Sequence, residues 1–165
     1  MEIYLIRHGI AVEAEATASD ADRWLTKRGT KKVRRVASNL RSLDLEIDII
    51  LSSPLVRAQQ TAELLVSKGL SETLEIHPDL APEGSLEHCV QWLQDYQFRH
   101  PLAQSVVLVG HEPSLSNLAE MLLFNQVFQR IQIKKAGIIA LHWPVTTSPL
   151  GNCQLSWLMP PKLWL

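Results

Sequence analysis

The stretch Met1-Glu2-Ile3-Tyr4-Leu5-Ile6-Arg7-His8-Gly9 decides the fold, because a short apolar run ends abruptly in an arginine, a histidine and a glycine. Residues 1–6 are too few for a buried helix and are typical of a central parallel strand. The triplet then lies at the carboxyl end of that strand, where open α/β sheets bind ligands. An arginine beside a histidine, with a glycine that lets backbone amides approach an anion, indicates a phosphate site. A solvated turn is the alternative while the triplet stands alone.

A second strand is expected to end in the same way. Residues 45–51 predict this strand, and Ser52-Ser53-Pro54 ends it. Because proline is favoured in the first turn of a helix, a helix is expected to begin at Pro54. Arg57 then projects from the helix N-terminus, just beyond the strand.

The clearest buried strand in the chain covers residues 105–109 and leads into Gly110-His111-Glu112-Pro113, ahead of another helix. His111 therefore occupies the same kind of junction as His8. Because the carboxyl ends of parallel strands share one edge of a sheet, we expect the two histidines and the two arginines to converge in one crevice.

These motifs give the chain a resemblance to the histidine phosphatase superfamily, the phosphoglycerate-mutase-like enzymes built around a nucleophilic histidine. Within that superfamily it is similar to the short SixA-type phosphohistidine phosphatases. The matching segments are Arg7-His8-Gly9 and residues 25–29, 52–62 and 109–113, which together span most of the first 115 residues. The resemblance implies a phosphatase that forms a phosphohistidine enzyme intermediate.

The resemblance also implies a role for each site residue. His8 is the expected nucleophile, Arg7 and Arg57 bind the phosphoryl group together with Gly9, and His111 is a second histidine that donates a hydrogen bond to that group. The chemistry agrees, because phosphoryl transfer spreads charge over three oxygens and needs fixed positive donors. Arginine offers a planar fork that keeps its charge. Nearby arginines also favour the neutral, nucleophilic form of a histidine.

A general acid is expected in a loop after the third strand in the larger members of the superfamily, and Glu83 is the candidate here. Its run Ala81-Pro82-Glu83-Gly84 departs from the usual acid motif of those relatives. An imidazole leaving group needs an acid less than an alkoxide does, because it leaves readily and takes its proton from water. The alternative is that Glu83 caps the helix that begins near Ser85.

Two other charged features have alternative interpretations. Glu112 follows His111, but no second histidine lies four residues further on, so the pair does not match a zinc-protease helix. Glu112 is then expected to cap the helix or to support the site from behind. A basic run, which comprises Lys27, Arg28, Lys31, Lys32, Arg34 and Arg35, predicts one solvated helix face. Recruitment of an acidic protein is the other reading of this run.

Composition places the chain among ordinary soluble proteins. It has 165 residues, 46% of them hydrophobic, and a formal net charge of −1, so nothing indicates nucleic-acid binding. No stretch approaches the ~18 apolar residues of a spanning helix, and the N-terminus lacks the pattern of a signal peptide. Two widely separated cysteines, Cys89 and Cys153, are consistent with free thiols in the cytoplasm. No metal or other cofactor is expected, because arginines and His111 fill the role that Mg²⁺ has in other phosphoryl-transfer sites.

The order of the elements predicts one α/β domain over residues 1–165, a three-layer αβα sandwich with a mainly parallel sheet. Residues 11–24 are expected to form an exposed loop over the site without regular structure. Strands are expected near 2–7, 46–51, 73–77 and 104–109, helices near 26–42, 54–68, 85–97 and 113–123, and an antiparallel hairpin from 136–143 and 154–158 at the sheet edge.

The length of one connection narrows the expected substrate. Relatives that act on small sugar phosphates generally insert a helical cap between the Arg57-type helix and the acid loop. Here only about twenty residues separate Thr61 from Glu83, which is enough for the end of one helix and one strand. We therefore expect an open site that accepts phosphohistidine on a protein, namely a histidine-phosphotransfer domain or a phosphotransferase-system protein. A broad-specificity phosphatase of small phosphate esters is the alternative, and a non-catalytic phosphate-binding module is a third possibility.

Overall fold

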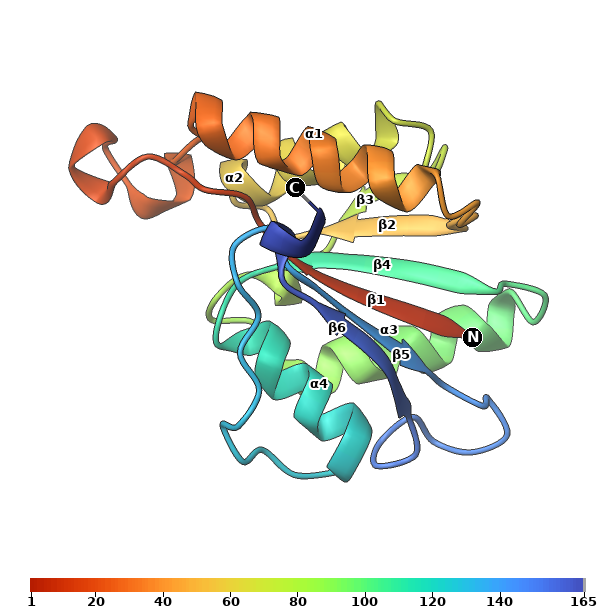
Figure 1. Cartoon of the computed structure of the whole chain (residues 1–165). Coiled ribbons are helices and arrows are strands. Elements are labelled where there is room, and N and C mark those ends of the chain that lie inside the picture. Colours follow the sequence, from red (N-terminus) through yellow and green to blue (C-terminus); the bar gives the residue numbers. More distant parts are fainter. Residues whose placement is uncertain (165) are drawn as a thin grey trace.

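The structure is a computed structural model that describes residues 1–164; Leu165 and the side chain of Trp164 lie outside the described part. A six-stranded sheet forms the centre of the molecule in the order β3-β2-β4-β1-β5-β6 (Figure 1). The strands are β1 (Glu2–Arg7), β2 (Ile49–Ser52), β3 (Leu74–Ile76), β4 (Ser105–Gly110), β5 (Ile138–His142) and β6 (Gln154–Met159).

The four strands β3, β2, β4 and β1 run parallel to one another. Strand β5 is antiparallel to β1, and β6 is antiparallel to β5. The predicted sheet, mainly parallel with an antiparallel C-terminal hairpin at one edge, is therefore confirmed.

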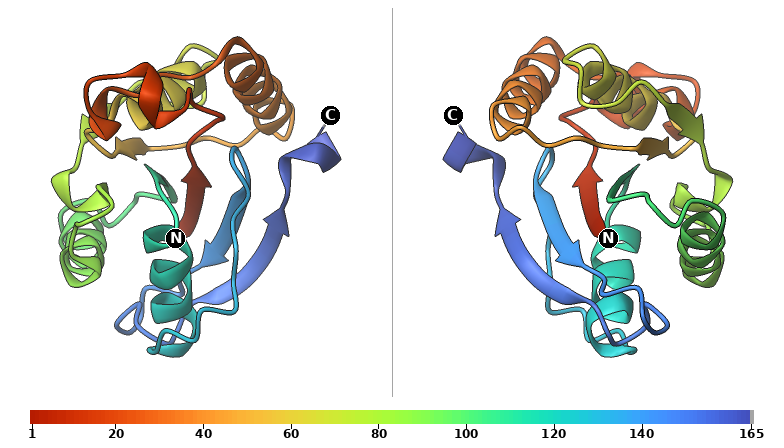
Figure 2. Two further views of the ribbon diagram at one scale, coloured as in Figure 1. Left: turned by 90° about the vertical axis from the view of Figure 1, so that its left-hand side faces the viewer. Right: turned by 90° about the vertical axis from the view of Figure 1, so that its right-hand side faces the viewer.

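Helices cover both faces of the sheet. Helices α1 (Lys27–Arg41) and α2 (Val56–Val66) lie on one face, and α3 (Leu86–Arg99) and α4 (Ser114–Phe124) lie on the other (Figures 1 and 2). Alternate residues of β1 point to opposite faces, so Tyr4 and Ile6 pack in the α1/α2 layer while Ile3 and Leu5 pack in the α3/α4 layer. The predicted three-layer architecture is confirmed.

Capping side chains define where two of the helices begin. The Thr26 hydroxyl accepts a hydrogen bond from the Gly29 amide at 2.9 Å, and the Ser85 hydroxyl accepts one from the His88 amide at 3.2 Å. Helix α2 begins two residues later than predicted, at Val56 rather than Pro54. Sheet hydrogen bonding continues past the end of β2, because the Ser53 amide donates to the Val109 carbonyl at 2.9 Å, and Leu55 remains extended.

The segment 11–24 is more regular than predicted. It is mostly exposed, as expected, but it contains two 3-10 turns, η1 (Ala14–Ala16) and η2 (Asp20–Asp22), and Ala11 forms an isolated bridge with Leu25. The prediction of an irregular loop was therefore wrong in part. In Figure 1 this segment projects past the carboxyl ends of the parallel strands.

The helices and the cysteines each bear on an expectation from the sequence. Within residues 1–164, no helix combines the length and the apolar character that crossing a bilayer requires. Both cysteines, Cys89 and Cys153, are free and buried, and burial raises the pKa of each thiol to about 12. Each thiol is therefore protonated at neutral pH.

Candidate active site

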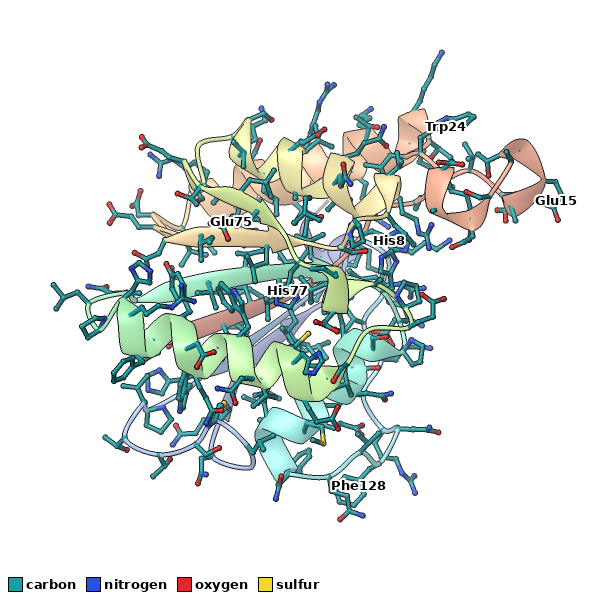
Figure 3. All side chains as sticks on the ribbon, turned by 180° about the vertical axis from the view of Figure 1, so that it is seen from behind. His8, Glu15, Trp24, Glu75, His77 and Phe128 are labelled. Atoms are coloured by element: carbon teal, nitrogen blue, oxygen red, sulfur yellow. The ribbon has the colours of Figure 1, made fainter. Side chains whose placement is uncertain are left out.

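The ends of three neighbouring strands bring the predicted histidines together. The His8 amide donates to the Gly110 carbonyl at 3.1 Å, which extends the pairing of β1 with β4 by one residue. His8 and His111 are both buried, and their ring centroids lie 5.0 Å apart. Figure 3 shows His8 at this end of the sheet, near the segment that carries Trp24 and Glu15. The predicted convergence of the two histidines is what the structure shows.

The His8 ring is held in one orientation. Its Nδ1 lies 2.7 Å from the carbonyl oxygen of Gly9, and a carbonyl can only accept, so Nδ1 carries the hydrogen. The lone pair is therefore on Nε2, where the Nε of Arg57 donates to it at 3.3 Å. Burial lowers the pKa of His8 to about 3, and the positive charges of Arg57 and Arg7 add to this effect. His8 is thus a neutral imidazole with Nε2 as its reactive atom.

His111 is the second histidine of the pair. Its Nε2 lies 2.8 Å from the Ser53 hydroxyl, while its Nδ1 is buried and has no hydrogen-bond partner within residues 1–164. Burial lowers the pKa of His111 to about 4, and the charges of Arg57 and Arg7 act in the same direction. Both imidazoles are therefore neutral at physiological pH, and the unpaired Nδ1 of His111 is a candidate contact for a ligand.

Arg57 is the most tightly held cation of the site. Its side chain is buried, and its Nη1 and Nη2 donate to the backbone carbonyl and the carboxylate of Asp20 at 2.6 and 2.8 Å. Because both terminal nitrogens donate to one residue, the end edge of the guanidinium faces Asp20. The other edge, formed by Nε and the second hydrogen of Nη2, is directed at His8. That edge is the fork that faces the nucleophile.

Asp20 is a site residue that the sequence did not reveal. It lies in η2, within the segment expected to be an irregular loop, and its carboxylate also pairs with Arg23 at 2.8 Å. Hydrogen bonds from Arg23 and Arg57 hold the pKa of Asp20 below its usual value. Asp20 is therefore ionised and orients Arg57 rather than supplying a proton. The only sequence signal was an aspartate three residues before an arginine.

Arg7 is held by the connection between α4 and β5. Its Nη1 donates to the Ile133 carbonyl at 2.9 Å, while its Nε is buried without a partner among the described residues. Glu112 supports the same segment, because its carboxylate accepts from the Ser116 hydroxyl at 2.6 Å and from the Ile133 amide at 3.3 Å. Of the two expectations for Glu112, these contacts agree with support of the site, whereas the helix cap is wrong, because Pro113 is the N-cap of α4 and no side chain caps it.

The loop that carries Ile133 depends on a buried acid, Glu120, which was not among the residues predicted from the sequence. Its carboxylate accepts hydrogen bonds from four successive backbone amides, those of residues 128–131. Burial raises the pKa of Glu120, but these four donors outweigh that effect and bring the pKa below its usual value. A glutamate within the apolar run of α4 was the available signal.

Gly9 allows the chain just beyond β1 to pack closely against α1, and its amide forms a hydrogen bond with α2. A β-carbon at this position would lie 2.7 Å from a Val33 methyl of α1. The Gly9 amide, expected to approach an anion, instead donates to the Thr61 hydroxyl at 3.1 Å, and that hydroxyl donates to the Arg57 carbonyl at 2.7 Å. Gly9 thereby ties the nucleophile strand to the helix that carries Arg57.

Glu83 lies apart from the histidine pair in its contacts. It is exposed, and its carboxylate forms no hydrogen bond or ion pair with the described residues. Its neighbour Pro82 accepts a hydrogen bond from the Ser114 hydroxyl at 3.2 Å, which places the loop beside the first turn of α4. The expectation that Glu83 caps α3 is wrong, because Ser85 is the capping residue. Its role as an acid stays a prediction.

Metal-binding side chains are not gathered anywhere in the described chain: within residues 1–164 no group of three His, Cys, Asp or Glu side chains could hold a metal ion.

The comparisons with known proteins agree with this geometry. A model of the histidine phosphatase superfamily (branch 1) matches residues 3–83. An uncharacterized protein of Picosynechococcus sp. is 43% identical over 142 residues, which cover 86% of this chain and 85% of the relative. The phosphohistidine phosphatase SixA of Escherichia coli strain K12 is 29% identical over 162 residues, which cover 98% of this chain and 94% of SixA.

A solved structure extends the similarity to the whole fold. The protein histidine phosphatase SixA complexed with tungstate matches all of this chain and all of its own chain, with a TM-score of 0.88 and 27% sequence identity. The family model, the full-length relatives and this structure all agree with the resemblance carried by the sequence motifs. The chain therefore belongs to the histidine phosphatase superfamily.

Proposed function

We propose that this phosphatase removes the phosphoryl group from phosphohistidine on a signalling or phosphotransfer protein, with His8 as the nucleophile. The substrate is expected to be a histidine-phosphotransfer domain or a phosphotransferase-system protein. The observation that carries the proposal is the state of His8, a neutral imidazole whose Nδ1 is bonded to the Gly9 carbonyl and whose Nε2 faces the Arg57 fork.

The reaction has two steps. Nε2 of His8 attacks the phosphorus while the bond from phosphorus to the substrate nitrogen breaks, and the released imidazole takes a proton from water. Water then attacks phosphorylated His8, which releases inorganic phosphate and restores the neutral imidazole. Arg57 donates to the phosphoryl oxygens from the edge that faces His8, and His111 donates a further hydrogen bond to the same group.

Two features support a protein substrate. Between α2 and α3 the chain forms only β3 and η3 (Pro78–Leu80), so this connection adds no helical cap over the strand ends. The name of the E. coli relative also states phosphohistidine as its substrate. An imidazole leaving group makes little demand on a general acid, in keeping with the exposed, unpaired carboxylate of Glu83.

A comparison of turnover on three substrates tests the proposal. Turnover is measured on a phosphorylated histidine-phosphotransfer domain, on nitrophenyl phosphate and on glycerol phosphate. We expect the highest kcat/KM on the phosphorylated domain. A preference for glycerol phosphate over every phosphohistidine protein tested would instead favour the broad-specificity phosphatase of small esters.

Glu83→Gln separates the two readings of Glu83. The variant is expected to hydrolyse phosphohistidine and nitrophenyl phosphate almost as the wild type does, and glycerol phosphate much more slowly, because only the alkoxide needs a proton. Glu75→Gln on the edge strand β3 is the matched control, since Glu75 is also exposed (Figure 3). An equal, large loss on all three substrates would show that Glu83 holds the site together.

A further inference from the structure

The outward surface of α1 is the most strongly charged part of the chain. We define the basic face as the six cations Lys27, Arg28, Lys31, Lys32, Arg34 and Arg35. Together with Arg41, the 15 residues of α1 carry seven positive charges and no acid. Because the whole chain has a net charge of −1, the other 150 residues carry a net charge of −8. Positive charge is thus concentrated on one helix.

The basic face makes no contribution to the fold through ion pairs. Within residues 1–164, none of its six side chains forms a salt bridge or a hydrogen bond. Five of them are exposed, and Lys32 is half-buried. The apolar side of the same helix, which includes Val33, Val36 and Leu40, already anchors it to the sheet.

The arrangement of these charges weakens the helix that carries them. Like charges repel at a spacing of four residues, as in Lys27 with Lys31, Arg28 with Lys32, and Lys31 with Arg35. The first turn contains cations and no acid, although the helix dipole favours acids at that end. Six cations that cost stability and form no internal pairs point to a contact outside this molecule.

The basic face begins close to the nucleophile. The Thr26 amide, at the N-cap of α1, donates to the Ile10 carbonyl at 2.9 Å, only two residues beyond His8. A β-carbon at Gly29 would lie 2.0 Å from that same carbonyl oxygen, so the first turn of α1 lies directly against this backbone. Figure 1 shows α1 starting at the end of the sheet where the site lies and running away from it. On the basic face, Arg28, Lys31, Lys32 and Arg35 line a hollow of about 210 Å³.

We propose that the basic face docks an acidic surface of the phosphorylated protein whose phosphohistidine enters the active site. This inference rests on the proposed function and adds the charge of the partner. A long polyanion such as DNA would extend beyond the basic face and meet the net negative charge of the other 150 residues, which disfavours its binding. A compact acidic protein is small enough to contact the basic face alone. A membrane is disfavoured because the apolar side of α1 is buried against the sheet and has nothing to insert.

Two phosphohistidine peptides test the docking. They share a central sequence that is flanked by four glutamates in one peptide and by four glutamines in the other. At low salt we expect the wild type to show about tenfold higher kcat/KM on the glutamate peptide, and high salt should abolish the difference. Nitrophenyl phosphate, which does not reach α1, reports the basal activity.

Charge reversal locates the effect. Lys31→Glu/Arg35→Glu is expected to lose the preference for the glutamate peptide, while the glutamine peptide and nitrophenyl phosphate are turned over as before. Its melting temperature should equal or exceed that of the wild type, because the new glutamates pair with neighbouring cations. Lys68→Glu/Arg99→Glu is the matched control, with the same change in charge at exposed positions outside α1, and should keep the preference.

The outcomes separate docking from catalysis. Equal turnover of the two peptides by the wild type, or equal loss of preference in both double variants, would overturn the docking proposal. If neither peptide is hydrolysed while nitrophenyl phosphate is, the proposed function fails. Binding of the unphosphorylated glutamate peptide, measured by fluorescence anisotropy, then decides the docking alone. Tighter α1-dependent binding of phosphatidylserine vesicles or a DNA duplex than of this peptide would also overturn it.

Discussion

Replacing Arg57 with lysine keeps the charge of the site and removes the fork. The guanidinium donates three hydrogen bonds, one from Nε to His8 and two from its terminal nitrogens to Asp20. A lysine ammonium is a single nitrogen and cannot reach the nucleophile while it spans both acceptors of Asp20. One charge-assisted bond to the transition state is worth ~1.5–4 kcal/mol, so kcat should fall by roughly tenfold to a thousandfold.

The assay is the hydrolysis of nitrophenyl phosphate, with kcat and KM measured separately and folding checked by circular dichroism. Asp20→Asn is the companion variant, because it keeps the backbone carbonyl that binds Nη1 and removes only the charge of the carboxylate. Its loss of kcat should be smaller than that of Arg57→Lys. A kcat of Arg57→Lys close to that of the wild type would refute the inference that the fork acts on the transition state.

Three further predictions concern stability, pH and metals. Glu120→Gln should lower the urea midpoint at pH 7, and because the folded-state pKa of Glu120 lies below its usual value of 4.5, the gap to the wild type should narrow as the pH falls below 4.5; a gap that stays constant on further acidification would contradict this. The pKa values of His8 and His111 are about 3 and about 4 in the folded protein, against 6.5 for an ordinary histidine. As the pH falls below 6.5, the unfolded chain therefore binds protons at these two residues before the folded protein does. Stability should therefore fall between pH 6.5 and 4, less so in His8→Asn/His111→Asn, and an identical slope in that variant would contradict the assignment. Finally, EDTA should leave turnover unchanged, and strong inhibition reversed by Mg²⁺ would contradict metal independence.

The site residues that lie at the ends of strands could be predicted from the sequence. His8 and His111 each follow a buried parallel strand, and Arg57 lies in the first turn of the helix after another. Side chains at these junctions meet because the strands pair in the sheet, so a correct strand assignment was sufficient. The start of α2 was wrong by two residues, since hydrogen bonding between Ser53 and Val109 is a tertiary contact that a local proline signal does not report.

The supporting residues were beyond this kind of prediction. Asp20 binds Arg57 across 37 positions of the chain, and its short 3-10 turn has no periodic pattern. The role of Glu120 could not be predicted for a different reason. Its carboxylate binds four backbone amides of a loop that has no sequence motif of its own. Both contacts depend on how loops fold back over the scaffold. Hydrophobic periodicity carries no information about that folding.

If His8 is the nucleophile, its Nε2 becomes phosphorylated in each catalytic cycle. The most direct measurement is rapid acid-free trapping of the enzyme during turnover of a ³²P-labelled substrate, followed by mapping of the label. We expect one labelled peptide that contains His8, with a bond that is labile in acid and stable in base, and no label in His8→Ala. Label that survives in His8→Ala, or that is stable in acid, would contradict the assignment of His8 as the nucleophile.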